Sequence, residues 1–506
     1  MGRKVSARVR GDNETKVQRF SEDALLVEMT RGSAGGSLPG VGRAALGGEG
    51  MGLLRGFRGL GLAAALLLGP PAQAGADAPL ACQDSGQCRA RSGNGSVCQS
   101  GSCEPYRDET DLFIAVGLSE KKAARPKAFE PLLAVLPAFA YNPTVGFLFG
   151  AVGIFGIYLG DPETTTISNL QAMVLYTTKN QFITQINSTF LTEGNTWEFQ
   201  GDWRFMLFNQ DTFGLGTGHT PVSSGFTING IGTTAAVDGA QPMNMNLLRF
   251  HQNALRKVWG ELYVGPGVSF DRYYGIEDLR LDLGASPPAV TSHYAYSQIA
   301  GFGTKAYNSN GLSLNVLYDT RDSTINAYRG VYASVSYQWN PTWFGNSQAA
   351  SFVSSEFRTY IGLSADVPRN VLAFWVFAQG QVSGTLPYLA LPSIGWDARN
   401  RTGRGWVQGR FRGTAEVYTE AEWRFRITDN GLLGGVVFAN LSTFTRPPVS
   451  YQGYVEAGES LFEHPEVAGG VGLRIMMNRQ SRTNITLDLT VAQHTTGFYF
   501  GAGEAF

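Results

Sequence analysis

The sequence has no uninterrupted apolar run long enough for a membrane-spanning helix, although 43% of its 506 residues are apolar. Such a helix needs about 20 consecutive apolar residues, so helical spans are excluded. The most apolar stretch, residues 132–159, is interrupted by Pro137, Asn142 and Pro143. Two strands joined by a turn at Asn142-Pro143 fit this stretch better than one helix.

Charged residues are also scarce, at 16% of the chain; soluble domains usually contain roughly 25%. The 40 basic and 41 acidic residues nearly cancel, which gives a net charge of −1. Proteins that bind nucleic acid normally show a basic excess, so the composition gives no case for a nucleic-acid partner. Glycine, in contrast, is abundant with 64 residues, and it suits the tight turns and bends of a barrel.

Residues that commonly perform catalysis are few and scattered. The five histidines lie far apart and outside any recognisable nucleophile motif; they are His219, His251, His293, His464 and His494. Residues 214–218 (GLGTG) have the glycine spacing of a phosphate loop but follow no strand–helix unit. We therefore expect no enzyme, no cofactor and no metal, and histidines that are solvated or hydrogen-bonded structural residues.

Cysteine is nearly absent, and all of it lies in one short segment. The four residues are Cys82, Cys88, Cys98 and Cys103, with small and polar residues between them that cannot build a core. In an oxidising compartment this pattern predicts two disulfides, for which three connectivities are possible. Zinc is the alternative, but the segment has neither a paired C-x-x-C nor a histidine.

What the sequence does have is a strict alternation between Ala415 and Ile427. One face would carry Ala415, Val417, Thr419, Ala421, Trp423, Phe425 and Ile427, and the other Glu416, Tyr418, Glu420, Glu422, Arg424 and Arg426. Side chains of a strand point to opposite sides with period two, and the alternation is longer than a usual soluble strand. In a membrane barrel the apolar face meets lipid and the charged face lines a wet lumen. We expect the charged row to be a lumen network rather than a catalytic acid pair.

Residues 197–207, 331–339 and 485–492 repeat the alternation, with aromatic residues near strand ends. Aromatic girdles of this kind are typical of membrane barrels, although each strand alone also fits a soluble all-β protein. Residues 131–506 have room for about sixteen strands with their connections, and bacterial barrels usually have an even number. The sequence therefore predicts an all-β fold, a transmembrane antiparallel β-barrel of about 16 strands.

Several motifs resemble, in the same order, those of the BamA/TamA family of outer-membrane barrels, or bacterial surface antigen family. They are Arg404-Gly405-Trp406, Gly409-Arg410-Phe411-Arg412, residues 421–425 (AEWRF), residues 318–322 (YDTRD) with Gly330, residues 434–440 (GGVVFAN), residues 470–474 (GVGLR), residues 485–488 (ITLD) and residues 497–506 (GFYFGAGEAF). The resemblance extends over roughly residues 130–506. It implies a barrel in the outer membrane of a Gram-negative bacterium.

The resemblance also implies that an ion pair holds a loop inside the barrel, and we call this ion pair the lock. In the family, the arginine of the RGF-type motif lies on a long extracellular loop that folds back into the lumen. Here Arg404, with Gly405 and Trp406, is the matching residue, and Glu422 is its matched acidic partner. The family's aspartate in the F-x-D strand motif is replaced by Asn440, which brings no charge. We therefore expect the loop to be released more easily than in relatives that have both acids.

Two further features follow from the resemblance. A proline that is usual before the glycine of the YDTRD segment is Ala327 here. Phe506 is expected to end the last strand, on the same face as Phe498, Phe500 and Glu504. A terminal aromatic is the family-like signal by which the assembly machinery recognises a new barrel, although Glu504 occupies a position that is often aromatic.

The amino-terminal part of the chain has the features of a targeting signal. Residues 51–74 contain two arginines, an apolar run over residues 60–68 and the small-residue site Ala72-Gln73-Ala74. This pattern predicts a secretory signal peptide with cleavage before Gly75. Translation is then expected to begin at Met51, with residues 1–50 as an annotation extension; a cytoplasmic extension with an apolar anchor is the alternative.

Residues 75–130 are expected to be a cysteine-rich periplasmic segment and linker ahead of the barrel at residues 131–506. Relatives that handle client proteins usually place soluble periplasmic modules there, and we expect this segment to be too short to contain them. The first functional hypothesis is assistance in the insertion or translocation of proteins, or lipid, through a barrel with a weak seam. Its partners would be outer-membrane lipids, unfolded outer-membrane proteins and periplasmic accessory proteins. The second is a passive channel or structural barrel, and an outer-membrane hydrolase such as a lipase has the least support.

Overall fold

The computed structural model describes residues 81–83, 87–88, 96–99, 101–105, 127–218, 234–364, 369–428, 431–451, 454–478, 482–493 and 495–506. By its internal contacts the chain divides into residues 1–73 and residues 74–506, and every described residue belongs to the second unit. The predicted extension, signal peptide and cleavage site lie outside the described residues.

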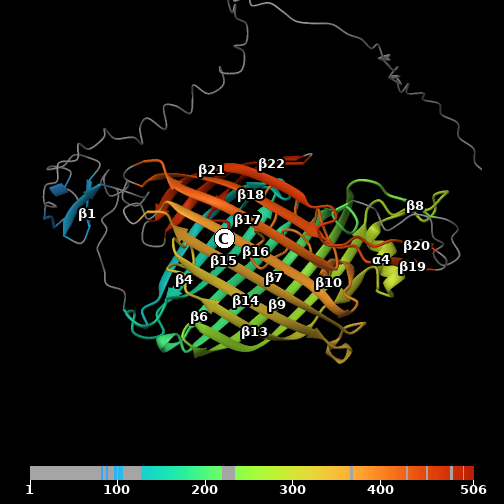
Figure 1. Cartoon of the computed structure of the whole chain (residues 1–506), viewed down its shortest axis with the longest axis horizontal. Coiled ribbons are helices and arrows are strands. Elements are labelled where there is room, and N and C mark those ends of the chain that lie inside the picture. The colour runs from blue at the N-terminus through green and yellow to red at the C-terminus, as the bar shows by residue number, and fades with distance from the viewer. Residues whose placement is uncertain are drawn as a thin grey trace, which may run out of the picture. The chain divides into compact units, whose positions relative to one another are not determined.

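The strands from β3 onward close into one antiparallel barrel (Figure 1). Its strands are β3 (Leu132–Asn142), β4 (Gly146–Ile157), β5 (Ser168–Thr177), β6 (Phe182–Leu191), β7 (Trp197–Thr212), β9 (Gln241–Trp259), β10 (Leu262–Asp278), β12 (Ala306–Asn308), β13 (Gly311–Asp319), β14 (Gly330–Asn340), β15 (Ala350–Gly362), β16 (Val371–Gly384), β17 (Ala415–Arg426), β18 (Leu433–Phe444), β21 (Glu466–Asn478), β22 (Thr483–Ala492) and β23 (Thr495–Ala502). The short β12 and the following β13 both pair with β10, so they form one interrupted strand of a 16-strand barrel. This confirms the predicted fold.

The barrel is built inside out relative to a soluble protein. On β17 the charged face, which includes Glu416, Glu420 and Glu422, is buried toward the interior. Trp423, on the other face, is exposed. Large apolar side chains are exposed on nearly every wall strand, among them Leu133, Phe139, Phe147, Val174, Phe205, Phe250, Leu314, Val335, Phe374, Val437 and Leu489. An apolar outer face with a polar interior is the arrangement that lipid requires.

The two rims of the barrel differ in the length of their connections. Long connections follow β7, β10, β16 and β18, which all end at the same rim because the strands run up and down. We call this rim the loop rim. The opposite rim has mostly short turns, such as Gly260-Glu261 between β9 and β10. Membrane barrels place short turns on the periplasmic side and longer loops outside, so the loop rim corresponds to the extracellular side.

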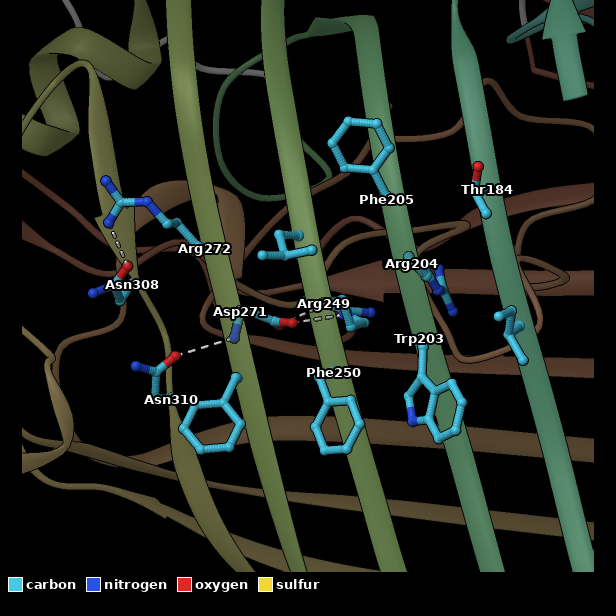
Figure 2. Close-up of a pocket in the computed structure, with 13 residues that line it drawn as sticks. Thr184, Trp203, Arg204, Phe205, Arg249, Phe250, Asp271, Arg272, Asn308 and Asn310 are labelled. Carbon is cyan, nitrogen blue, oxygen red and sulfur yellow. Dashed lines mark hydrogen bonds and ion pairs between the residues drawn. The ribbon is translucent and has the colours of Figure 1, made fainter. Parts of the chain in front are cut away.

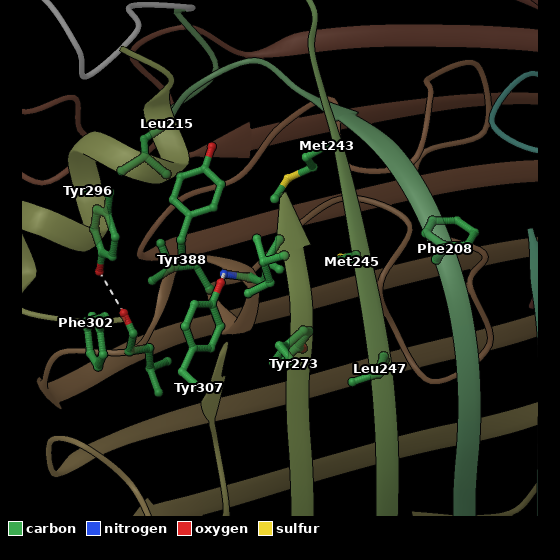
Figure 3. Packing of buried hydrophobic residues seen from close by; sticks show 14 of the residues in the cluster. Phe208, Leu215, Met243, Met245, Leu247, Tyr273, Tyr296, Phe302, Tyr307 and Tyr388 are labelled. Carbon is green, nitrogen blue, oxygen red and sulfur yellow. Dashed lines mark hydrogen bonds between the residues drawn. The ribbon is translucent and has the colours of Figure 1, made fainter. Parts of the chain in front are cut away.

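The connections at the loop rim have structure of their own. They contain the helix α4 (Ser292–Ala300), the paired strands β8 (Ala235–Ala236) and β11 (Ala289–Val290), the hairpin β19 (Val449–Tyr451) and β20 (Tyr454–Glu456), and the short helical turns η2 (Thr342–Phe344) and η3 (Tyr388–Ala390). Tyr296 of α4 and Tyr388 of η3 pack with Met243 and Met245 of β9 in a buried cluster (Figure 3). The cluster anchors these connections to the wall.

The cysteines form two disulfides, Cys82–Cys98 and Cys88–Cys103, with Cα–Cα distances of 5.9 and 5.3 Å. Cys98 lies on β1 (Ser96–Gln99) and Cys103 opposite it on β2 (Ser102–Pro105), yet each bonds to a cysteine outside the hairpin. The predicted pair of disulfides is confirmed, and the structure selects one of the three connectivities. All four sulfurs form disulfides in the structure.

In the part of the chain that the structure describes, no helix is both long and apolar enough to cross a membrane.

Candidate functional site

The connection between β16 and β17, residues 385–414, folds back into the barrel, and we call it the lumen loop. The hydroxyl of Tyr388 lies 2.6 Å from the hydroxyl of Thr212 on β7. Arg204, on the same strand, donates a 2.8 Å hydrogen bond to the backbone carbonyl of Ala398. The lumen loop is therefore held against the β7 side of the wall as well as at its own two ends.

Arg404 connects the lumen loop to two strands on the other side of the barrel. Its guanidinium forms ion pairs with Glu420 and Glu422 on β17. Its Nη1 lies 3.0 Å from Oδ2 of Asp488 on β22. All four side chains are buried. A buried arginine costs free energy unless it is paired and hydrogen-bonded, and three carboxylates meet that requirement here.

The structure places Glu422 beside Arg404, as the family motifs suggest, but it also brings in Glu420 and Asp488. Asn440 does not face the guanidinium; its Nδ2 donates a 2.9 Å hydrogen bond to the backbone carbonyl of Arg404. The charge that an aspartate at position 440 would bring is thus supplied by two acids from other positions. Both occur in patterns visible in the sequence, the alternating row and the motif ending at Asp488, but only the closed barrel shows that they meet.

The two residues after Arg404 fix its position. Gly405 has φ +105°, and a Cβ there would lie 2.8 Å from the Cβ of Ala468, so glycine is required on both counts. Trp406 is buried, and its ring centroid lies 4.9 Å from that of Phe411 in a small apolar cluster. This packing holds the loop where Arg404 reaches its acids.

The lumen loop also contacts the last strand of the barrel, β23. The amide of Gly405 donates a 3.0 Å hydrogen bond to the hydroxyl of Tyr499, and that hydroxyl donates a 3.3 Å bond to the carbonyl of Trp406. Arg401 donates a 3.3 Å bond to the carbonyl of Ala502 at the end of β23. The position of the loop is therefore linked to the position of β23.

The barrel closes between β23 and β3, and this seam is the weakest joint of the wall. Among the described residues, Phe500 opposite Tyr141 is the single paired position of the two strands. In contrast, β3 pairs with β4 along its whole length from Leu132 to Asn142. Backbone hydrogen bonds are the main attraction between strands in lipid, so a joint with so few of them opens at the lowest cost.

The residues after β23 explain why the seam is short. Gly503 has φ +84°, and the chain bends away from the wall there; we call residues 503–506 the tail. The carboxylate of Glu504 accepts a 2.8 Å hydrogen bond from Arg474 and a 2.6 Å bond from Asn484. Arg424 donates a 2.9 Å bond to the backbone carbonyl of Phe506. These partners face the lumen, so the tail lies inside the barrel.

Phe506 is consequently not at the end of the last strand. β23 ends at Ala502, and the ring of Phe506, 3% exposed, packs 5.2 Å from that of Trp375 on the inner side of β16. The prediction that Phe506 ends the last strand and shares one face with Phe498, Phe500 and Glu504 is therefore wrong, because the bend at Gly503 turns the tail inward. The role of Phe506 as an assembly signal stays a prediction.

The tail also leaves part of β3 uncovered. If β23 continued in the register of Phe500 and Tyr141, Gly503 would lie opposite Ala138 and Phe506 opposite Val135. With the tail in the lumen, residues 132–138 have no pairing partner on this side among the described residues. The result is a free backbone edge within the barrel wall.

The described histidines include two that are hydrogen-bonded to carboxylates. Nδ1 of His293 lies 2.8 Å from Asp278, and Nε2 of His251 lies 3.0 Å from Asp271. Such contacts are what the sequence predicts for structural histidines. His219 and His494 lie outside the described residues.

Comparison with known structures gives distant matches to outer-membrane barrels. One is BamA from Haemophilus ducreyi lacking POTRA domains 1–3, with 12% identity over 73% of this chain and 70% of that one, at a TM-score of 0.43. Another is CdiB from Acinetobacter baumannii, with 11% identity over 74% of this chain and 60% of that one, at a TM-score of 0.40. CdiB from Escherichia coli has 10% identity over 73% and 62%, with the same TM-score. Likenesses this distant carry no argument about function.

Comparison of the sequence with curated proteins finds no match. Comparison with family models matches residues 286–506 to the Omp85 superfamily domain. This range includes β12 to β23, the lumen loop and the tail. Residues 286–506 are therefore an Omp85 superfamily domain, which confirms the resemblance to BamA/TamA-type outer-membrane barrels.

Proposed function

We propose that the protein assists the insertion or translocation of other proteins, or of lipid, at the outer membrane of a Gram-negative bacterium, and that it works through the seam between β3 and β23. The observation that carries this proposal is the free edge of β3, residues 132–138, beside a seam with one paired position. This edge is exposed without partial unfolding of the wall, because the tail lies in the lumen and does not pair with it.

A free strand edge offers unpaired N–H and C=O groups to another strand. In lipid such groups must find partners within protein, so an incoming strand gains more from this edge than it would in water. The outward side chains of the edge suit a lipid boundary, since Leu133 is 73% exposed and Val135 68% exposed. Pro137 has no N–H, so pairing along the edge is interrupted at one position.

The lumen loop is connected to the seam and limits how far β23 can move. Tyr499 of β23 accepts a hydrogen bond from the amide of Gly405. Arg404, which precedes Gly405, forms ion pairs with acids on β17 and β22. If β23 shifts away from β3, either these contacts break or the lumen loop moves together with β23. We infer that the lock on Arg404 sets how readily the seam widens.

Unfolded outer-membrane proteins are the proposed clients, and periplasmic accessory proteins are proposed to deliver them. A passive channel is the alternative. Depletion of the protein separates the two, and the readouts are the amount of folded outer-membrane proteins and the uptake of small solutes. Loss of folded outer-membrane proteins supports the proposal, whereas a change in solute uptake alone supports the channel.

A further inference from the structure

The outer wall at β6, β7, β9 and β10 contains a groove of about 550 Å³. It lies between two rows of outward side chains that run across the strands (Figure 2). Cross-strand register places Phe270, Phe250, Trp203 and Ile186 in the lower row and Arg272, Leu248, Phe205 and Thr184 in the upper row. The two rows are thus mostly apolar, with Arg272 at one end of the upper row and Thr184 at the other.

Aromatic packing gives the groove a fixed floor. The rings of Trp203 and Phe250 are stacked with centroids 5.5 Å apart, and Phe250 lies 6.4 Å from Phe270. Phe270 in turn lies 4.8 Å from Phe344 of η2. A row of rings held in this way keeps its shape without a ligand and presents a surface that fits an acyl chain.

Arg272 is the charged group at the end of the upper row, and it forms no ion pair with an acid among the residues that the structure describes. Its Nη1 donates a 3.1 Å hydrogen bond to Oδ1 of Asn308, which is its hydrogen-bond partner among the described residues. Asn308 is itself held by a 2.9 Å bond from its Nδ2 to the carbonyl of Gly345. The two other arginines that line the groove have carboxylate partners, because Arg249 lies 2.8 Å from Asp271 and Arg204 lies 2.7 Å from Asp202. Arg272 therefore keeps N–H donors and an uncompensated charge on the outer surface.

The position of Arg272 corresponds to the head-group level of the outer leaflet. Below it on β10 the outward residues are apolar, and in the row above it Asn246 lies opposite Tyr274. Trp343, in the η2 turn next to Gly345, is 66% exposed at the loop rim. Exposed tryptophans mark the interfacial girdle of a membrane barrel. An arginine at this level meets lipid head groups rather than hydrocarbon.

We propose that this groove binds a phosphate-bearing membrane lipid, with the phosphate on Arg272 and Asn308 and an acyl chain along Phe270, Phe250 and Trp203. Guanidinium donates two parallel hydrogen bonds to phosphate oxygens, which suits a phosphate better than a neutral head group. The acyl chain lies between the two rows and covers the aromatic floor. The site is independent of the seam, so it does not depend on the proposed role in insertion.

Native mass spectrometry of the purified full chain tests the site, with dioleoyl phosphatidylglycerol as the probe. Dioleoylglycerol, which lacks the phosphate, and glycerol phosphate, which lacks the acyl chains, are the ligand controls. We expect the wild-type protein to retain the phospholipid and neither control ligand. Arg272→Gln should lower retention at least about tenfold, because it removes a charged hydrogen bond to phosphate. Phe250→Ala should also lower it.

Arg256→Gln is the matched variant, since Arg256 is an outward arginine of β9 near the opposite rim, 5.8 Å from the ring of Trp197. Its phospholipid retention should equal that of the wild type. Heat-modifiable migration shows that each variant is folded, and Arg272→Lys, which keeps the charge, should retain part of the binding. Equal retention by Arg272→Gln and wild type, or equal retention of dioleoylglycerol, would overturn the proposal.

Discussion

The amide of Gly405 donates a 3.0 Å hydrogen bond to the hydroxyl of Tyr499, and this bond joins the lumen loop to the strand that forms the seam. The next residue back along the loop, Arg404, is held by acids on β17 and β22. One short segment therefore connects three strands of the wall. We therefore expect changes in the loop to alter the seam.

Loss of the lock should release the lumen loop. Arg404→Ala removes one ion-pair partner from each of three buried carboxylates. Glu422 keeps Arg424 and Asp488 keeps Arg474, whereas Glu420 loses its ion pair. Breaking a buried ion pair in this way costs about 3–5 kcal/mol. Glu422→Gln should have a smaller effect, because Glu420 and Asp488 still bind the arginine. The measurement is the rate at which protease cleaves residues 385–414 in the folded protein. The double variant should be little worse than Arg404→Ala alone; additive effects would show that Arg404 and Glu422 act separately.

Release of the tail should lengthen the seam. Glu504→Gln weakens the ion pair with Arg474, and the freed tail is then able to continue β23 along β3. In that register Ala505 lies opposite Leu136, so a cysteine introduced at each of these positions should form a disulfide more often in the Glu504→Gln background. The yield of this cross-link is read by mass spectrometry. An unchanged yield would mean that Glu504 does not hold the tail in the lumen.

Removal of Phe506 should reduce the amount of assembled, heat-modifiable protein. Its ring is buried beside Trp375, and loss of a buried phenylalanine costs about 3–5 kcal/mol. Phe506→Leu keeps most of the apolar volume and serves as the control. If Leu restores assembly, lumen packing explains the effect; if it does not, an aromatic assembly signal does. Full assembly without Phe506 would contradict both roles.

The turn between β13 and β14 should be sensitive to acid. Burial acts to raise the pKa of Asp322, but hydrogen bonds from Arg482 and from the amides of Tyr328 and Arg329 outweigh burial and lower that pKa. Because the folded pKa lies below the ordinary value of about 3.9, the contribution of Asp322 is present above that value and is lost as pH falls through the folded pKa. The protection factors of residues 320–329 against amide exchange, taken relative to the unfolded chain at the same pH, should therefore fall at low pH. Asp322→Asn should show the same low protection at neutral pH, and protection that does not change would exclude this role.

Removal of the disulfides should leave the barrel intact. Both bonds connect residues within 82–103, with sequence separations of 16 and 15, so their stabilisation of about 3 kcal/mol each stays local. The variant with serine at all four cysteines should keep its heat-modifiable migration. Peptide mapping of the wild type should give Cys82–Cys98 and Cys88–Cys103. Loss of the folded barrel would show that the segment contributes to it.

The sequence predicts the wall of this protein better than its interior. Alternation over β17 identifies an outer and an inner face because side-chain direction in a strand depends on local backbone geometry alone. The position of Arg404 near Glu422 also follows, but only by resemblance to a family. Asp488 as a third partner cannot be predicted, since it depends on how far β17 lies from β22 in the closed barrel. The same holds for the tail, where the bend at Gly503 is stabilised by Arg474 and Asn484 from other strands.

The most direct test of the proposed function is a disulfide across the seam. Cysteines at Tyr141 and Phe500 lie opposite each other and should bond when oxidised. A matched pair at Leu489 and Phe498 joins the neighbouring, fully paired strands β22 and β23. The measurement is the amount of folded outer-membrane proteins in cells whose native copy is depleted. We expect the 141–500 bond to abolish rescue, reduction to restore it, and the 489–498 bond to have no effect. Full rescue with the seam bonded would show that the protein does not work through this seam.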